Sequence, residues 1–334
     1  MLLPHQGKRA RRTGLAALAA LAFNATVVCV LPGQGGAPVE KSGQVVLTYL
    51  GTAGWEISDG TTILLIDPYL SRIIGPSPPG APLIERTPGD TRPVYGWEDR
   101  PVPDAAVIDS HVPRADFILV SHTHYDHVLD VPHIALKTNA SVIGTESTEN
   151  VLRAYGVPEP QLITVRGGED YQFATFSVKV IPSIHSALDH KHYFSSARAL
   201  RGMKAPLTLQ QMHPEGGTLA FLIRFRGHQI LAFGGMNYIE REIEGLRPEV
   251  VLVGAAPSRA EIYDYTGRLM RDLGFPAMVL PTHWDNFMAP YGASQQPALD
   301  ALQSFLREVH TASPNTKVIV PRYFEPVALE PATK

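Results

Sequence analysis

The sequence is poor in cysteine, with Cys29 as the only one among 334 residues. A single thiol cannot form an intramolecular disulfide, and it cannot build the thiolate clusters that hold structural zinc. Any metal in this protein must therefore be held by histidine, aspartate or glutamate side chains.

An excess of basic residues is also missing. The chain has 29 Lys and Arg against 32 Asp and Glu, which gives a formal net charge of −3. Nucleic-acid-binding proteins usually show a basic excess or a basic stripe. We therefore expect a small-molecule substrate and no nucleic acid as partner, with the oligomeric state left open. The 44% hydrophobic and 18% charged residues are ordinary for a globular protein with a large core.

Acidic residues are absent from the first 13 positions, where four bases are found: Lys8, Arg9, Arg11 and Arg12. An apolar stretch follows over 14–31, and a Pro- and Gly-rich linker over 32–36. A basic start, an apolar centre and a small-residue exit are typical of an export signal. We expect residues 1–36 to be an export signal or a membrane anchor with its linker, so that the protein is periplasmic, secreted or membrane-anchored. A misassigned start codon or a disordered tail is the alternative.

Residues 40–334 are expected to form a single domain of mixed α and β structure. Apolar or alternating runs predict strands over 44–51, 55–58, 61–66, 117–120, 140–144, 161–165, 172–181, 218–225, 228–233, 250–254, 277–280 and 317–320. Helices are predicted over 148–155, 261–273 and 297–309. Two long insertions, 71–115 and 186–213, are expected to form the walls of a pocket. No phosphate-binding glycine motif occurs in the right context, so two sheets are favoured over a doubly wound nucleotide fold.

The most informative stretch reads H-x-H-x-D-H and follows the apolar run 117–120. Imidazole nitrogens suit zinc, and a carboxylate can complete its coordination shell. Side chains alternate along a strand, so His122 and His124 are expected to point the same way from a strand end. Asp126 and His127 then lie where the chain turns and can face a second ion. A solvated, histidine-rich loop is the alternative.

Other polar and aromatic residues also follow predicted strands. His185 and His283 each do so, where a further metal ligand would lie. Asp67 is expected either to orient a ligand histidine through its second ring nitrogen or to serve only as a turn residue. Weaker candidates for the pocket, with surface or core positions as the alternative, are His190, His192, Tyr238 and Trp284.

With these residues together, the chain resembles the metallo-β-lactamase superfamily over nearly everything after residue 44. The stretches 50–54 and 64–68 look like the ascorbate-6-phosphate-lactonase-like branch, which also holds N-acyl phosphatidylethanolamine phospholipase D. The resemblance implies a four-layer αββα sandwich with one or two zinc ions at one edge of the sheets. It implies a first zinc held by His122, His124 and His185. It implies a second zinc held by Asp126, His127 and His283.

The chain departs from this family at the residue that normally bridges the two metals. The stretch 233–237 matches a Gly-Asp-Thr motif, and the aspartate position falls on Gly235. Loss of the bridge removes one ligand from each metal and leaves the repulsion between the ions less compensated. Three outcomes follow. The second zinc is weak or absent, Asn237 or Asp285 replaces the bridge, or the site works with Asp, two His and water, as in some true β-lactamases.

The expected activity is metal-dependent hydrolysis, in which zinc-bound hydroxide attacks a carbonyl or phosphorus centre and Asp126 orients the attacking water. Ester, lactone and phosphodiester substrates all fit this chemistry. Three alternatives remain: an exported β-lactamase-like amide hydrolase, a degenerate member that binds metal or ligand without turnover, and a di-iron redox protein. The redox alternative expects a further carboxylate ligand where this chain has Gly235.

Overall fold

The computed structural model describes residues 43–76, 86–187 and 197–331. The chain from Glu40 to Lys334 groups into one compact unit. The export segment predicted over residues 1–36 lies outside the described ranges and stays a prediction. Within those ranges, no helix combines the length and the apolar character needed to cross a membrane.

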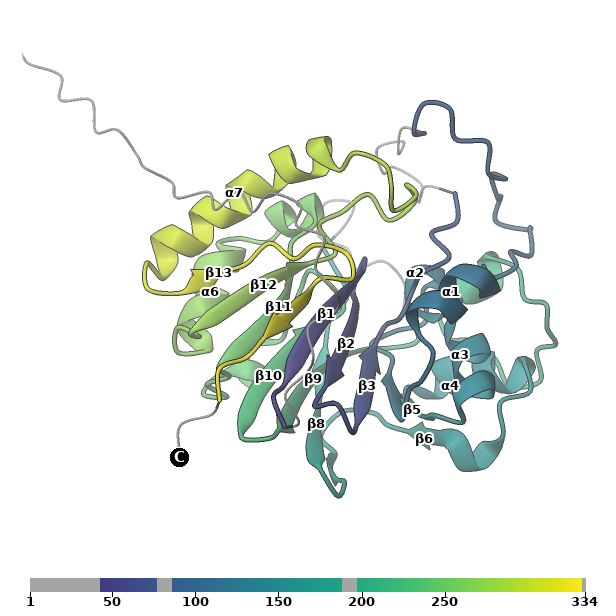
Figure 1. The fold of residues 1–334 in the computed structure, drawn as a ribbon, viewed down its shortest axis with the longest axis horizontal. Coiled ribbons are helices and arrows are strands. Elements are labelled where there is room, and N and C mark those ends of the chain that lie inside the picture. Colours follow the sequence, from purple (N-terminus) through teal and green to yellow (C-terminus); the bar gives the residue numbers. More distant parts are fainter. Residues whose placement is uncertain (1–42, 77–85, 188–196, 332–334) are drawn as a thin grey trace, which may run out of the picture. The chain divides into compact units, whose positions relative to one another are not determined.

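In the described part of the chain, the strands form two seven-stranded sheets (Figure 1). The first sheet has the order β14-β1-β2-β3-β4-β5-β6, with the bounds β1 Val46–Gly51, β2 Gly54–Ser58, β3 Ile63–Ile66, β4 Phe117–Leu119, β5 Ser141–Gly144, β6 Leu162–Thr164 and β14 Pro326–Ala328. The second sheet has the order β13-β12-β11-β10-β9-β8-β7, with the bounds β7 Asp170–Gln172, β8 Phe176–Ser183, β9 Thr218–Phe225, β10 His228–Phe233, β11 Val250–Gly254, β12 Met278–Thr282 and β13 Lys317–Val318.

Seven α-helices accompany the sheets in the described ranges. They are α1 Ala105–His111, α2 Tyr125–Val128, α3 Val131–Thr138, α4 Glu146–Ala154, α5 Glu240–Ile243, α6 Tyr265–Asp272 and α7 Gln296–Ala312. Short 3₁₀ turns cover Glu159–Gln161, Gln210–Met212 and Pro257–Glu261.

The first sheet is buried on both faces, and its side chains reveal how the layers stack. In β3, Leu64 and Ile66 belong to a core that includes side chains of both sheets and of α6 and α7. Leu65 points the other way, into a second core that includes side chains of α3 and α4. Helices therefore cover the outer face of each sheet. The predicted four-layer αββα sandwich is confirmed.

Most predicted elements are present with ends shifted by a few residues, but three predictions are wrong. The strand predicted over 172–181 is the hairpin β7–β8, because the chain turns back over residues 173–175. The helix predicted from residue 261 begins at Tyr265, because Asp264 has a left-handed φ of 44° that interrupts the helical backbone. The strand predicted over 317–320 is present as β13 but does not close the fold as expected, because β14 follows it and pairs antiparallel with β1.

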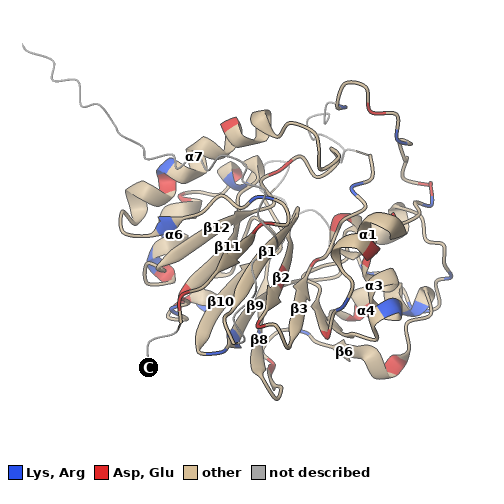
Figure 2. Ribbon diagram, in the orientation of Figure 1, with Lys and Arg blue, Asp and Glu red and all other residues tan. Residues whose placement is uncertain are grey.

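Charged side chains of both signs are mixed on the outer helices of the second sheet (Figure 2). On α6, Arg271 is followed directly by Asp272, and on α7, Arg307 is followed by Glu308. Arg268 on α6 also pairs with Glu240 of α5 at 2.7 Å. This mixture is typical of a solvated helix face.

Candidate metal centre

The H-x-H-x-D-H motif lies on the loop after β4 and on the short helix α2. Because β4 ends at Leu119, the prediction that His122 and His124 continue a strand is wrong, and both lie on the loop. The loop is anchored by Thr123, whose backbone N–H donates to the carbonyl of Glu215 at 3.1 Å. This hydrogen bond from Thr123 to a neighbouring segment therefore fixes the backbone that was expected to be held in a strand.

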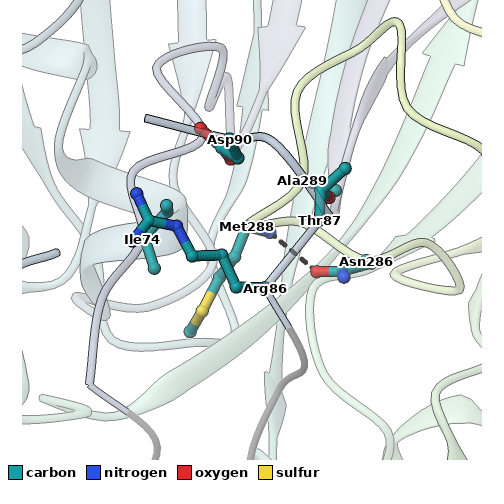
Figure 3. A pocket seen from close by; sticks show the side chains of 7 residues that line it. All are labelled: Ile74, Arg86, Thr87, Asp90, Asn286, Met288 and Ala289. Atoms are coloured by element: carbon teal, nitrogen blue, oxygen red, sulfur yellow. Dashed lines mark hydrogen bonds between the residues drawn. The ribbon is translucent and has the colours of Figure 1, made fainter. Parts of the chain in front are cut away.

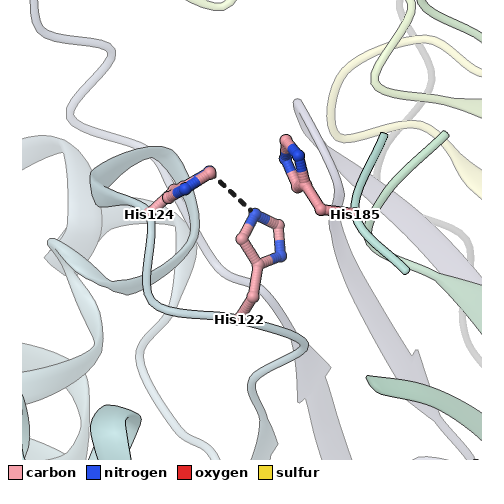
Figure 4. Close-up of side chains that lie close together, drawn as sticks. All are labelled: His122, His124 and His185. Atoms are coloured by element: carbon pink, nitrogen blue, oxygen red, sulfur yellow. Dashed lines mark hydrogen bonds between the residues drawn. The ribbon is translucent and has the colours of Figure 1, made fainter. Parts of the chain in front are cut away.

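His122, His124 and His185 converge as one buried group (Figure 4). Their candidate ligand atoms all lie within 4.8 Å of one another, and each pair of ring centroids is 4.6 Å apart. His185 reaches the group from the second sheet, just after β8. Burial lowers the pKa of His185 to about 3 and holds the pKa of the other two well below the ordinary value. All three imidazoles are therefore neutral near pH 7, the form that binds metals.

Asp126, His127 and His283 form a second buried group within the same 4.8 Å limit. Oδ2 of Asp126 lies 3.1 Å from Nε2 of His283 and 3.5 Å from Nε2 of His127. Burial acts to raise the pKa of Asp126, but the two imidazoles outweigh burial and hold that pKa far below its usual value. The ring centroids of His122 and His127 are 3.9 Å apart, so the two groups are immediate neighbours.

Asp67, fully buried at the end of β3, supports both groups. Its carboxylate accepts hydrogen bonds from Nδ1 of His127 at 2.9 Å, and from the backbone N–H and the hydroxyl of Ser121 at 2.7 and 2.5 Å. The Ser121 hydroxyl oxygen in turn lies 3.0 Å from Nδ1 of His122. The hydrogen bond to Nδ1 of His127 is the contact predicted for an Asp67 that orients a histidine through its second ring nitrogen.

The donor set fits a metal ion. Because a carboxylate can only accept, Nδ1 of His127 donates to Asp67, and Nε2 is left facing Asp126. This Nε2 atom is buried and has no hydrogen-bond partner in the part of the chain that the structure describes. Burial alone would lower the pKa of His127, but Asp126 and Asp67 outweigh it and raise that pKa, so the pocket favours positive charge. A bound cation would supply that charge and satisfy the nitrogen.

Replacing Asp67 by asparagine is expected to weaken metal binding at the second group by about 10- to 100-fold. In either orientation of the asparagine amide, its NH₂ group would face a hydrogen-bond donor, either Nδ1 of His127 or the backbone N–H of Ser121, from which the carboxylate accepts. Zinc titration of the purified variant measures the effect. Asp116→Asn is a matched control, because Asp116 accepts from the backbone N–H of Ile63 at the start of β3. Equal zinc affinity in Asp67→Asn and wild type would contradict the orienting role.

Neither Asn237 nor Asp285 takes over the bridging position. Oδ1 of Asn237 accepts from the backbone N–H of Tyr238, and both oxygens of Asp285 are held by other residues. A Cβ atom at Gly235 would approach the carbonyl oxygen of His185 well inside 3.0 Å, a distance that real Cβ contacts essentially never show. Neither proposed replacement therefore joins the two groups, and a side chain at 235 would overlap backbone.

The weaker candidates for the pocket have other positions. Trp284 and Tyr238 belong to the core between the layers, and the Tyr238 hydroxyl donates to the carbonyl of Tyr265 at 2.8 Å. Both therefore take the core alternative. His190 and His192 lie outside the described residues.

Three partly exposed aromatic rings near the groups were missed in the sequence. The imidazole of His213 stacks on His124 with centroids 5.3 Å apart, and Trp97 meets His213 edge-on at 4.4 Å. Phe287 meets His283 edge-on at 5.4 Å. Trp97 and His213 come from the insertions 71–115 and 186–213, which were expected to form pocket walls. That expectation was the only signal, because nothing local in either segment reveals which residue faces the site.

Comparison with known proteins agrees with this geometry. A family model described as "Beta-lactamase superfamily domain" matches residues 64–284. A relative from Anaeromyxobacter sp. (strain K), named "UPF0173 metal-dependent hydrolase", is 26% identical over 276 residues, covering 78% of this chain and 81% of the relative.

Solved structures share the fold at low identity. A possible metal-dependent hydrolase from Veillonella parvula superposes with a TM-score of 0.54 at 13% identity, covering 86% of this chain and 100% of that one. An isothiocyanate hydrolase from Delia radicum gut bacteria gives a TM-score of 0.52 at 16% identity, covering 86% and 99%. These similarities concern the fold alone, whereas the family match spans more than half of the chain and includes every candidate ligand. The chain therefore belongs to the metallo-β-lactamase superfamily.

Proposed function

We propose that the protein is a zinc-dependent hydrolase that acts on an ester, lactone or phosphodiester. The observation that carries the proposal is the pair of adjacent, buried groups of metal-ligating side chains. A donor set of imidazoles and one carboxylate, without thiolate, suits zinc. The name metal-dependent hydrolase, borne by a relative that aligns over most of the chain, supports the same reaction class. The proposed assignment to the narrower lactonase-like branch rests on the sequence of stretches 50–54 and 64–68.

Zinc held by these residues would lower the pKa of a coordinated water to about 7 and would polarise the substrate oxygen that gains charge. The protein supplies the rest. His122, His124 and His185 remain neutral through burial and keep their lone pairs available. Asp126 remains ionised, so it can accept a hydrogen bond from the attacking water and fix its direction.

The rings around the two groups favour a substrate with an apolar portion. Trp97 and His213 lie beside the first group, and Phe287 lies beside the second. Aromatic side chains offer large apolar surfaces at small conformational cost, and they exclude water from the reacting atoms. We infer that the acyl or alkyl part of the substrate packs against these rings.

The test is metal analysis of purified protein together with a panel of ester, lactone, phosphodiester and β-lactam substrates. We expect zinc in the protein and turnover in one of the first three classes. Optical spectra separate zinc from iron, because zinc is colourless. Turnover of β-lactams alone would favour the amide-hydrolase alternative. Bound zinc without turnover of any class would identify a degenerate member and defeat the proposal.

Asp126→Asn is expected to lower kcat by roughly 10²-fold or more, because the amide orients water poorly and weakens metal binding at the second group. Rates on the substrate found in the panel measure this. Asp109→Asn is a control, since Asp109 is a carboxylate at the surface that pairs with Lys137 and His133. Unchanged kcat in Asp126→Asn would remove Asp126 from the mechanism.

We further infer from residues 1–36 that the enzyme is exported. The sequence pattern alone supports this. Fractionation of cells that express the full chain, with the mass of the mature protein, tests it. Intact protein found only in the cytoplasm would contradict it.

A further inference from the structure

Arg72 is a charged side chain that is 1% exposed, and each nitrogen of its guanidinium contacts one segment, with a further hydrogen bond from Nη2 to the hydroxyl of Tyr323 at 3.3 Å. Nη1 pairs with Oδ2 of Asp285 at 2.9 Å. Nε donates to the carbonyl of Ala289 at 2.6 Å, and Nη2 donates to the carbonyl of Asn286 at 2.5 Å. These three residues belong to the segment that follows His283, so one buried side chain determines its path.

Asp285 connects the same segment to the first sheet. Oδ1 accepts from the hydroxyl of Tyr49 at 2.9 Å and from the backbone N–H of Thr52 at 3.0 Å, and Oδ2 accepts from Tyr323 at 2.7 Å. The carbonyl of Thr52 accepts the backbone N–H of His283. His283 is therefore held through its own backbone, and Asp285 holds the residue that accepts from it.

The backbone at these positions is strained in a coordinated way. Thr52, Arg72 and His283 have φ angles of 55°, 46° and 52°, in the left-handed region that side chains other than glycine rarely adopt. Such conformations persist where the surrounding contacts impose them, and they occur often at functional sites. The strain therefore marks His283 as a residue whose placement depends on its neighbours.

A second arginine closes the arrangement from outside. Arg92 donates to the backbone carbonyls of Arg72 and Met288, both at 2.6 Å. Figure 3 shows the small pocket formed there, where Asn286, Met288 and Ala289 face the segment that carries Arg86 and Asp90. Residues 86–92 of the insertion thus pack against the segment that follows His283.

We propose that Arg72 and Asp285 form a positioning pair that places His283, and that this pair determines metal affinity at the second group without affecting the first. The inference rests on the proposed function only in taking a divalent metal as the ligand. None of the three histidines of the first group lies on the segment that Arg72 holds. Neither member belongs to the two groups of candidate ligands, so both are positioning residues.

The test is zinc titration of the Arg72→Lys variant, with the visible spectrum of the cobalt-substituted protein as a second readout. Lysine keeps the positive charge opposite Asp285 but cannot reproduce the planar fork that reaches two carbonyls. We expect affinity at the second group to fall tenfold or more, and affinity at the first group to stay within twofold. The cobalt spectrum should lose the contribution of the second ion.

Arg259→Lys is the matched control. Its guanidinium is also buried, pairs with Glu308 at 2.8 Å and donates to Ser304 at 2.7 Å on α7. If a buried arginine contributes only to stability, its replacement by lysine lowers the melting temperature and leaves both metal affinities unchanged. We expect this result for Arg259→Lys. Arg72→Lys should instead lose affinity at the second group.

Asp285→Asn tests the pair from its other member and covers the case in which Arg72→Lys fails to fold. It removes the charge and keeps an oxygen for Tyr49 and Thr52, and it should give the same selective loss. Equal loss at both groups, no loss at either, or a wild-type chain that binds only one metal would each overturn the proposal. A one-metal chain that still hydrolyses its substrate would leave the proposed function intact.

Discussion

His122→Ala is expected to empty the first group of metal and to lower hydrolysis by more than about 100-fold, because even the outer partners of metal ligands typically contribute about 10- to 100-fold. His122 is fully buried and lies at the junction of the site. Its ring contacts His124 and His185 of its own group and lies 3.9 Å from His127 of the other. No other candidate ligand is as central, so its loss should affect both ions.

His185→Ala should give the same loss of the first metal from the opposite sheet. Zinc content after purification and the hydrolysis rate measure both variants. His228→Ala is the matched control, because His228 is also buried and pairs with Glu249 at the far end of β10. The control should lose stability but keep its zinc. Unchanged metal content and activity in both His122→Ala and His185→Ala would refute the metal centre.

The candidate ligands could be predicted from the sequence because their positions follow from local pattern. The motif keeps four of them within six residues, and His185 and His283 follow strands whose ends meet at one edge of the sandwich. The two sheets could be predicted as well, because short apolar runs in the sequence indicate their strands. The wrong prediction of a strand at His122 does not change the set of candidate ligands, because the short spacing of the motif keeps its four side chains close together in a loop as well.

Long-range partners could not be predicted in this way. Nothing near Asp285 in the sequence reveals that it pairs with Arg72, so the sequence alone leaves Asp285 available to a metal. His213 and Trp97 lie in different insertions, and only the folded chain brings their rings together beside His124. The three-residue strand β14 could not be predicted for the same reason, since its partner β1 lies at the other end of the domain's sequence.

Gly235→Asp illustrates how the structure reverses an expectation from sequence. By sequence alone, restoring the bridging aspartate should tighten binding of the second metal. In the structure, a Cβ at 235 would overlap the carbonyl oxygen of His185 and lie 3.1 Å from its carbonyl carbon and Cα. That carbonyl also accepts the backbone N–H of Met236 at 2.8 Å, so it cannot turn away freely. Little room remains on the other side, because even a Cβ built on Gly254 would overlap the carbonyl oxygen of Gly235.

We therefore expect Gly235→Asp to displace His185, to weaken the first metal about tenfold or more, and to destabilise the fold by roughly 1–3 kcal/mol, as overpacking does. Gly235→Ala should reproduce most of this loss, since it adds the same Cβ without a carboxylate. Gly292→Ala is the control, because a Cβ there meets nothing within 4 Å. Zinc titration and thermal unfolding of the three variants separate the effects. Tighter second-metal binding in Gly235→Asp, with no loss in Gly235→Ala, would show that the chain between β10 and α5 adapts to a side chain, and that Gly235 reflects the loss of a ligand rather than the packing of His185.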